Sequence, residues 1–462
     1  MRKNSGFQGR KRPEIHRHFL NAVDFRLFLR KEEKMGKDRI SIEPRTAKWR
    51  ILYALVMAEG EMAFDTLQLM PNADRTVRSA VEELTEAGLI AVRKTDAGKI
   101  VRLKQFAKNR DRFMDRMWEG AGGYPLTVLY HTDAEHIRRK HSMAELCMLF
   151  SGTGIRSDPK VLDDIADRIE ETGSFLGEGD PLLPVFLPST TCKRLTGAVP
   201  EPGNISDRTA AGRFNGCIVS SAGCYTVYSL KGDPAEWGTS EERSSADISR
   251  RVRESILGTW PEKLAGRAEE MSYGDTQNRF IGNGAILYMK NYEDFTYCFE
   301  RPAAGRRNRR TGLECFCGRN TVSHVFDRVY ALPAERCAAG LTELMTEPGW
   351  HLRLTDLFVE KRFTDLSRSF FDIDGITAGK KILCFVDCDI RRLLMLIMDM
   401  AARKNQEEYI IVHYGFQKPF LERLFEMFGI PEGCSFVSCT PEEVLGEIGK
   451  RRTRKLAEHG KE

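Results

Sequence analysis

Residues 75–90, RTVRSAVEELTEAGLI, decide how the N-terminal part of this chain is interpreted. Val77, Val81 and Leu84 recur at the spacing that places apolar side chains on one face of a helix. Asp74 precedes this pattern as the expected N-cap, and Gly88 is a residue type that commonly ends a helix. The stretch therefore predicts a helix that leads directly into a strand beginning near residue 89.

The segments on either side of this helix predict further elements. Upstream, we expect a first helix from residue 45 to about residue 59, then a short helix over 63–69 and a turn at Pro71-Asn72. Downstream, 89–94 and 99–103 have the pattern of a β-hairpin. Helix, helix, turn, helix and hairpin in this order predict a winged helix-turn-helix, whose third helix enters the major groove of DNA.

This prediction identifies the side chains that would contact DNA. The first residues of a recognition helix face base edges and phosphates, and the hairpin and first helix reach the phosphate backbone. The candidates are therefore Arg75, Thr76, Arg78 and Ser79 on the recognition helix, Lys94 and Lys99 on the hairpin, and Arg45 and Lys48 at the start of the first helix. A winged helix that binds only protein is the alternative, because a fold does not dictate a function.

Charge is distributed unevenly along the 462 residues. The net charge is only +5, but the first fifty residues hold 15 Lys and Arg against 6 Asp and Glu, and basic runs recur at 306–310 and 450–455. Such runs favour a polyanionic partner, although they are also common in solvated tails. With no secretory signal and no apolar stretch long enough to span a membrane, we expect a cytoplasmic protein with free thiols.

The rest of the chain predicts a mixed α and β region and then a more regular C-terminal unit. The mixed region is indicated by helices at 130–150 and 244–272, a hairpin over 217–230, a turn at 282–284, and strands at 286–289, 295–300 and 354–360. In the C-terminal part, three strands alternate with three helices, which is typical of a parallel three-layer unit. The strands are expected at 381–386, 409–413 and 435–438, and the helices at 391–403, at 419–428 and after residue 440.

The expected fold class is therefore α+β or α/β and multidomain. Several domains are expected from length alone, since a single core rarely organises more than about 250–300 residues. The segments are a basic tail with a short helix (1–42), the winged helix-turn-helix (43–106), a helical region and loop linker (107–210), a mixed α/β domain (211–378), a C-terminal α/β unit (379–450) and a basic tail (451–462).

Asp387 and Asp389 raise the question of catalysis, because two carboxylates after a strand can hold a divalent cation for phosphoryl chemistry. Their Asp-x-Asp spacing resembles that of toprim and haloacid-dehalogenase folds, but Arg391 stands where the dehalogenase pattern expects Thr or Val. Cys315 and Cys317 lack the Cys-x-x-Cys spacing of zinc sites. We therefore expect loop and capping roles for the aspartates, with no catalytic residue, metal or cofactor. A metal-dependent nuclease or phosphotransferase is the alternative.

Several segments together resemble uncharacterised winged-helix proteins of conjugative and integrative mobile elements in Gram-positive bacteria and, more distantly, the plasmid replication-relaxation family. They are the winged helix and the stretches 130–155, 215–219, 382–389 and 409–420. The resemblance implies a role in replication, mobilisation or transcriptional control of a mobile element, with relaxosome proteins among the partners.

The sequence thus predicts a sequence-specific protein that binds double-stranded DNA, rather than an enzyme. A protein-interaction scaffold is a further alternative. Winged helices that read palindromes favour a homodimer, although no heptad seam is visible to build one.

Overall fold

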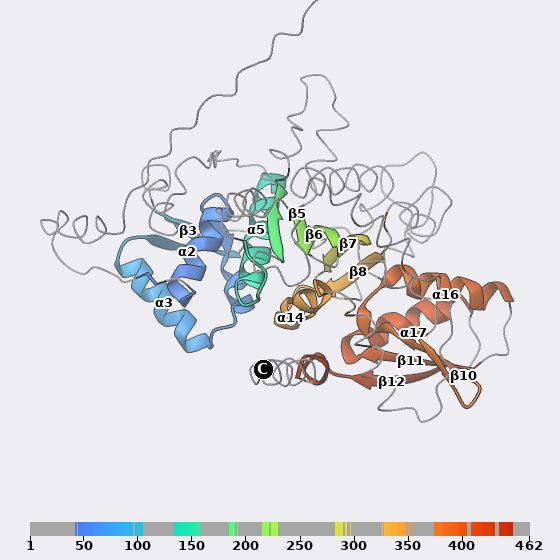
Figure 1. Ribbon diagram of the computed structural model, residues 1–462. Coiled ribbons are helices and arrows are strands. Elements are labelled where there is room, and N and C mark those ends of the chain that lie inside the picture. The colour runs from blue at the N-terminus through green and yellow to red at the C-terminus, as the bar shows by residue number, and fades with distance from the viewer. Residues whose placement is uncertain are drawn as a thin grey trace, which may run out of the picture. The chain divides into compact units, whose positions relative to one another are not determined.

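The protein is described by a computed structural model (Figure 1). The structure describes residues 42–43, 45–95, 98–104, 134–157, 184–189, 192, 215–220, 223–229, 282–289, 292, 296, 326, 328–347, 350, 354, 374–403, 408–429 and 434–446. Over these residues the fold is a mixture of α-helices and β-strands in several sheets, which confirms the predicted class at that level. All of them belong to one compact unit, Ile42–Glu462.

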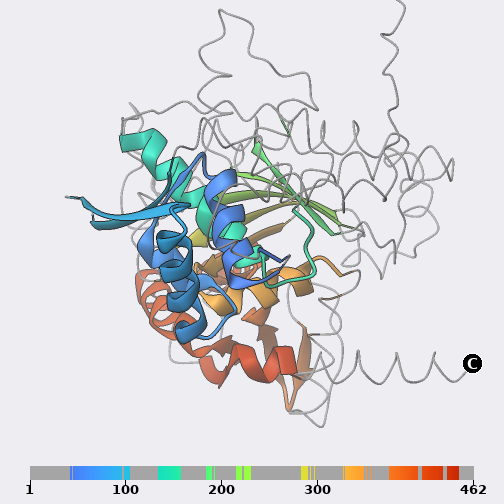
Figure 2. The same cartoon turned by 90° about the vertical axis from the view of Figure 1, so that its left-hand side faces the viewer.

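The first described elements form a small group of helices around a three-stranded sheet. They are α2 (Ala47–Met57), β1 (Glu61–Ala63), the 3-10 helix η1 (Phe64–Leu69), α3 (Asp74–Glu86), β2 (Ile90–Thr95) and β3 (Gly98–Leu103). The strands pair antiparallel in the order β1-β3-β2. Figure 2 shows the β2–β3 hairpin projecting away from the helices.

Local interactions explain where these elements begin and end. The Thr46 hydroxyl caps α2 by accepting a hydrogen bond from the backbone N–H of Trp49 at 3.3 Å. Gly88 follows the end of α3 with a φ of +72°, in the left-handed region that glycine adopts at little cost. The predicted N-cap Asp74 is wrong, because Ala73 is the cap and Asp74 is the first helical residue, with its carboxylate near Arg336 instead.

The predicted short helix over 63–69 is only partly correct. Residues 61–63 form strand β1, because each of them pairs with a residue of β3 from Arg102 to Ile100. The remaining six residues form a 3-10 helix rather than an α-helix. The elements on either side, α2, α3 and the hairpin, lie where the apolar spacing predicted them.

A central five-stranded sheet has the order β4-β5-β6-β7-β8. Its strands are β4 (Val185–Pro188), β5 (Gly216–Ser220), β6 (Gly223–Ser229), β7 (Gly282–Met289) and β8 (Arg328–Pro333). The first three pair antiparallel, and β6, β7 and β8 run parallel. Strand β4 lies inside the segment expected to be a loop linker, and the expected turn at 282–284 is instead the start of β7.

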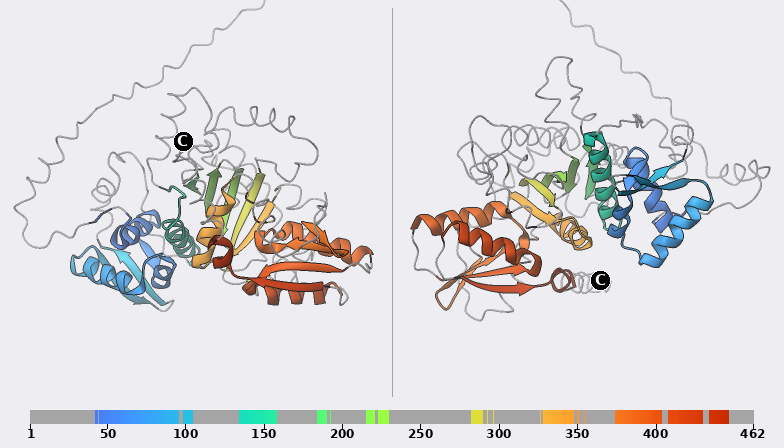
Figure 3. Two further views of the ribbon diagram at one scale, coloured as in Figure 1. Left: turned by 60° about the horizontal axis from the view of Figure 1, so that its bottom comes forward. Right: turned by 180° about the vertical axis from the view of Figure 1, so that it is seen from behind.

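The C-terminal sheet has the order β12-β11-β10-β9. Strands β10 (Lys380–Cys384), β11 (Tyr409–Tyr414) and β12 (Cys434–Cys439) are parallel, as the sequence predicted. The short strand β9 (Gly375–Thr377), which was not predicted, adds an antiparallel edge. Helices α16 (Ile390–Arg403) and α17 (Lys418–Met427) cover the same face of this sheet (Figure 3).

Two hydrophobic cores lie on opposite faces of the central sheet, and each also includes residues of the C-terminal unit. One core joins Val219 and Leu287 to Leu393 of α16 and Leu424 of α17. The other joins Ile218 and Ile286 to α5 (Ala134–Phe150), to α14 (Arg336–Met345) and to Ile382 and Val412 of the C-terminal sheet. The mixed region and the C-terminal unit therefore share their cores.

Several predicted elements lie outside the described residues. These are the basic N-terminal tail, the helix at 244–272, most of the strands at 295–300 and 354–360, Cys315 and Cys317, and the basic runs at 306–310 and 450–455. Within the described part of the chain, no helix combines the length and apolar character that crossing a membrane requires.

Candidate functional site

Helix α3 presents the predicted recognition residues on its solvent side. Val77, Ala80, Val81 and Leu84 are buried, which fixes the rotation of the helix against its neighbours. The opposite face is exposed, and its first two turns carry Arg75, Thr76, Arg78 and Ser79. The structure therefore brings these four candidate residues together on one accessible stretch of helix.

The second half of the exposed face of α3 has the opposite charge. Glu82, Glu83 and Glu86 follow the two arginines and are all exposed. Because like charges repel, the glutamates disfavour contact between this end of the helix and a phosphate backbone. A polyanion would therefore contact only the first two turns of α3.

Glu83 contacts two of the residues predicted to bind DNA. The Lys48 Nζ lies 2.9 Å from one carboxylate oxygen of Glu83, and the Ser79 hydroxyl donates to the other oxygen at 3.0 Å. The hydrogen bond from Lys48 is the largest of several effects that lower the pKa of Glu83. The Lys48–Glu83 ion pair thus links α2 to α3, whereas the Ser79–Glu83 hydrogen bond lies within α3. Any contact of Lys48 or Ser79 with phosphate would have to compete with Glu83.

The tip of the β2–β3 hairpin carries two lysines directly opposite each other. Lys94 pairs with Lys99 in the strand register, and both are exposed. The Thr95 hydroxyl closes the turn by donating to the Gly98 carbonyl at 2.8 Å, and the Lys99 ammonium lies 4.3 Å from the centre of the Phe64 ring. Like charges at a cross-strand pair are unfavourable, so this arrangement is one that a bound anion would stabilise.

Arg45 lies just before the start of α2. It is exposed and has a φ of +66°, which is uncommon for a residue with a side chain. Burial lowers the pKa of Arg50, and the charge of Arg45 lowers it further. Arg50 also donates to the Asn72 side chain at 3.0 Å, next to the start of α3.

Arg93 and Arg336 are cations of this region that sequence reasoning missed. Arg93 is exposed on β2 next to Lys94, and its position in the basic hairpin was a sufficient signal. Arg336 lies more than 260 residues away in sequence but donates to the Gln68 carbonyl at 2.6 Å. No pattern in the sequence signals that contact.

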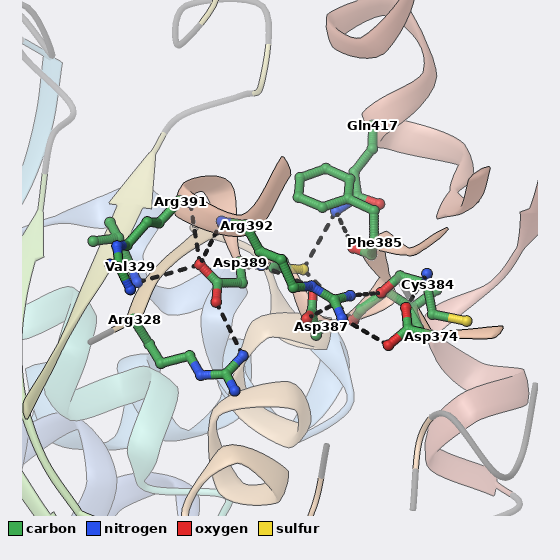
Figure 4. Close-up of polar contacts among 12 residues, drawn as sticks. Arg328, Val329, Asp374, Cys384, Phe385, Asp387, Asp389, Arg391, Arg392 and Gln417 are labelled. Atoms are coloured by element: carbon green, nitrogen blue, oxygen red, sulfur yellow. Dashed lines mark hydrogen bonds and ion pairs between the residues drawn. The ribbon is translucent and has the colours of Figure 1, made fainter. Parts of the chain in front are cut away.

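Asp387 and Asp389 lie between β10 and α16, on either side of Cys388, whose φ of +59° is left-handed. Figure 4 shows Asp387 and Asp389 among the guanidinium groups of Arg328 and Arg392. One Asp387 oxygen lies 2.9 Å from Arg392 Nη2, and the other accepts the backbone N–H of Asp389 at 3.0 Å. Asp389 lies 3.2 Å from Arg328 Nη1 and accepts the backbone N–H of Arg391 at 3.1 Å. Both carboxylates are thus occupied by cationic and amide donors.

A third carboxylate, Asp374, completes this buried network. Its oxygens contact Arg392 Nη1 at 2.7 Å and the backbone N–H of Cys384 at 2.6 Å. Burial raises the pKa of Asp389, and the charge of Arg328 opposes that rise. Burial alone would lower the pKa of Arg392, but Asp374 and Asp387 outweigh it and the net pKa is raised.

These contacts favour a structural role for the three aspartates. Two guanidinium groups and several backbone N–H groups contact the oxygens of the three carboxylates, and a metal ion would need the same oxygens as ligands. In the described portion of the chain, no group of three or more His, Cys, Asp and Glu residues is placed to hold a metal ion. Glu360, the upstream acid that a toprim-like site would require, lies outside the described residues.

Comparison with protein-family models, curated proteins and solved structures found no match for this chain.

Proposed function

We propose that this chain binds double-stranded DNA through a winged helix-turn-helix formed by α2, η1, α3 and the β2–β3 hairpin, with α3 as the recognition helix. The observation that carries the proposal is the exposed start of α3, where Arg75, Thr76, Arg78 and Ser79 are adjacent and solvent-facing. Arginine, threonine and serine at this position of a recognition helix are the residue types that hydrogen-bond base edges and phosphates.

Two further features support the proposal. The opposed Lys94 and Lys99 extend from the same small sheet and supply charge for a flanking phosphate backbone. The order β1-β3-β2, with α2 and α3 packed on the sheet, is the arrangement that presents a recognition helix and a wing. We extend the proposal to sequence-specific binding in replication, mobilisation or transcriptional control of a mobile element, which the sequence resemblance supports.

The test is duplex binding by the full chain across a salt series. We expect the logarithm of the association constant to fall linearly with the logarithm of salt concentration, because phosphate contacts release counterions. The double variant Arg75→Ala/Arg78→Ala should bind more weakly, with a slope reduced by about 0.9 for each phosphate that it no longer neutralises. Selection from a random duplex pool then measures sequence preference, which the double variant should lose.

Lys418→Ala/Arg423→Ala is the matched control. Both residues are exposed on α17 and form ion pairs there with Glu422 and Glu426, so their removal also costs two positive charges but lies outside α3 and the hairpin. We expect this variant to bind DNA like the unaltered chain. Salt-independent binding, no binding, or equal losses in both variants would overturn the proposal and favour a protein partner.

A further inference from the structure

Helix α14 begins beside the start of α3. The Arg336 Nε donates to the Gln68 carbonyl at 2.6 Å, and its Nη2 lies 3.3 Å from an oxygen of Asp74, the first residue of α3. The Arg336 side chain nevertheless remains 48% exposed. A guanidinium group from the central part of the molecule thus lies at the start of α3.

Other contacts link the segments next to α3 to the rest of the molecule. A Cβ added to Gly152, just after α5, would lie 2.9 Å from the ring of Pro71 in the turn that precedes α3, so the Gly152 backbone packs closely against that ring. The Tyr53 hydroxyl of α2 donates to the Ser157 carbonyl at 2.8 Å. These contacts hold α2 and the turn before α3 against the segment that follows α5.

The Arg336–Asp74 ion pair itself contributes little to stability. Both side chains are largely exposed, at 48% and 78%, and exposed ion pairs contribute little because water and salt screen them. The observed contacts use two of the five N–H donors of the guanidinium group. The remaining donors suit a phosphate, which arginine binds in a bidentate manner.

We propose that Arg336 contacts the phosphate backbone of the same duplex that α3 binds, so that the DNA interface extends from the winged helix onto α14. This inference rests on the proposed function. It identifies a positioning contact rather than a base-reading one, because phosphate contacts carry no direct sequence information. Asp74 then acts as a competitor that the phosphate displaces from Arg336.

The experiment compares Arg336→Ala, Arg336→Lys and Asp74→Asn in the full chain. Arg336→Ala should weaken binding to all duplex sequences and lower the salt slope by about 0.9, whereas Arg336→Lys should keep the slope. Asp74→Asn should strengthen binding, because it removes a negative charge beside Arg75 and Arg336. If Arg336 contacts phosphate, the two variants change DNA affinity in opposite directions: Arg336→Ala lowers it and Asp74→Asn raises it. If the Arg336–Asp74 pair is only structural, both variants bind DNA more weakly.

Each remaining outcome has a definite meaning. If the unaltered chain binds DNA and Arg75→Ala/Arg78→Ala weakens it, but Arg336→Ala does not, the inference fails and the proposed function stands. If the unaltered chain does not bind duplex DNA, both fail. The thermal midpoint of each variant is measured in parallel, and a large drop for Arg336→Ala with an unchanged salt slope would also overturn the inference.

Discussion

Arg392 and Arg423 both form ion pairs with acidic side chains, but their surroundings differ. The Arg392 side chain is 9% exposed and bridges Asp374 and Asp387, each 2% exposed. Arg423 and its partner Glu426 are mostly exposed. Breaking a buried pair leaves uncompensated charge in a medium that solvates it poorly. We therefore expect Arg392→Met to lower the free energy of unfolding by about 3–5 kcal/mol, and Arg423→Met by roughly 0–1 kcal/mol.

Urea denaturation of both variants measures this difference in the free energy of unfolding. Repeating the denaturation of the unaltered chain with added Mg²⁺ tests whether the aspartates bind a metal ion. If the aspartates are structural, added Mg²⁺ leaves the unfolding midpoint of the unaltered chain unchanged. A metal ligand set would instead raise that midpoint with increasing Mg²⁺, because binding to the folded state alone is stabilising. Equal losses for the two methionine variants would contradict the assignment of Arg392 to a buried network.

Single residues also show how far the sequence could predict the candidate site. The exposure of Arg75 and Arg78 follows from the helical spacing of Val77, Val81 and Leu84, which can be seen in sequence. The contact of Arg336 with Gln68 could not be predicted, because it depends on how two distant segments pack.

At the scale of elements, α5 connects two parts of the structure. Near its middle, Lys140 Nζ lies 3.5 Å from Glu59, and His141 Nε2 lies 3.9 Å from Glu61, which is too long for a hydrogen bond. Further along the same helix, Leu146, Leu149 and Phe150 belong to the core shared with the central sheet. Protonation of His141 therefore places a charge at the contact between α5 and strand β1.

This position predicts a pH dependence of stability. Burial lowers the pKa of His141 below its usual 6.5, Glu61 opposes the shift, and Lys140 adds to it. The unfolded chain then binds more protons than the folded chain between the lowered pKa and 6.5, so stability is lost as pH falls through that window. His141→Gln should lose less stability on acidification than the unaltered chain.

Urea midpoints at about pH 7.5 and about pH 5.5 test this expectation, because histidine titrates between them. Burial is the main cause that lowers the pKa of His413, so His413 also makes the protein less stable as pH falls. The His141→Gln variant should therefore retain part of the dependence of stability on pH. The same pH slope in both proteins would show that His141 does not exchange protons differently in the two states.

Elements differ in how well sequence predicts them, for a physical reason. The C-terminal strands β10, β11 and β12 are apolar runs separated by amphipathic helices, so their pattern is local and was predicted correctly. Strands β1 and β9 have three residues each and exist because a distant or neighbouring strand pairs with them. Gly284 was expected in a turn, but it lies in β7, where a Cβ would come within 2.5 Å of the Tyr225 ring.

At the scale of the whole molecule, the shared cores determine how the described elements unfold. Leu341 of α14 is 1% exposed and lies in the same cluster as Ile286 of the central sheet and Val412 of the C-terminal sheet. The backbone N–H of Ala331 in β8 also donates to the Cys388 carbonyl at 2.9 Å, which joins the central sheet to the turn between β10 and α16. A cavity at Leu341 should therefore weaken both sheets.

We expect Leu341→Ala to lower the free energy of unfolding by about 2–5 kcal/mol, through reduced apolar burial and the cavity left behind. Native-state hydrogen exchange measures this change separately in β7 and β11. If the sheets form one cooperative unit, the exchange free energies of their slowest amides fall by the same amount. If the C-terminal unit were an independent domain, β11 would keep its protection while β7 lost it, and a fragment of residues 374–462 would fold alone. We expect that fragment to lack cooperative unfolding, because Ile382 and Val412 would lose the side chains of α14 and the central sheet that cover them.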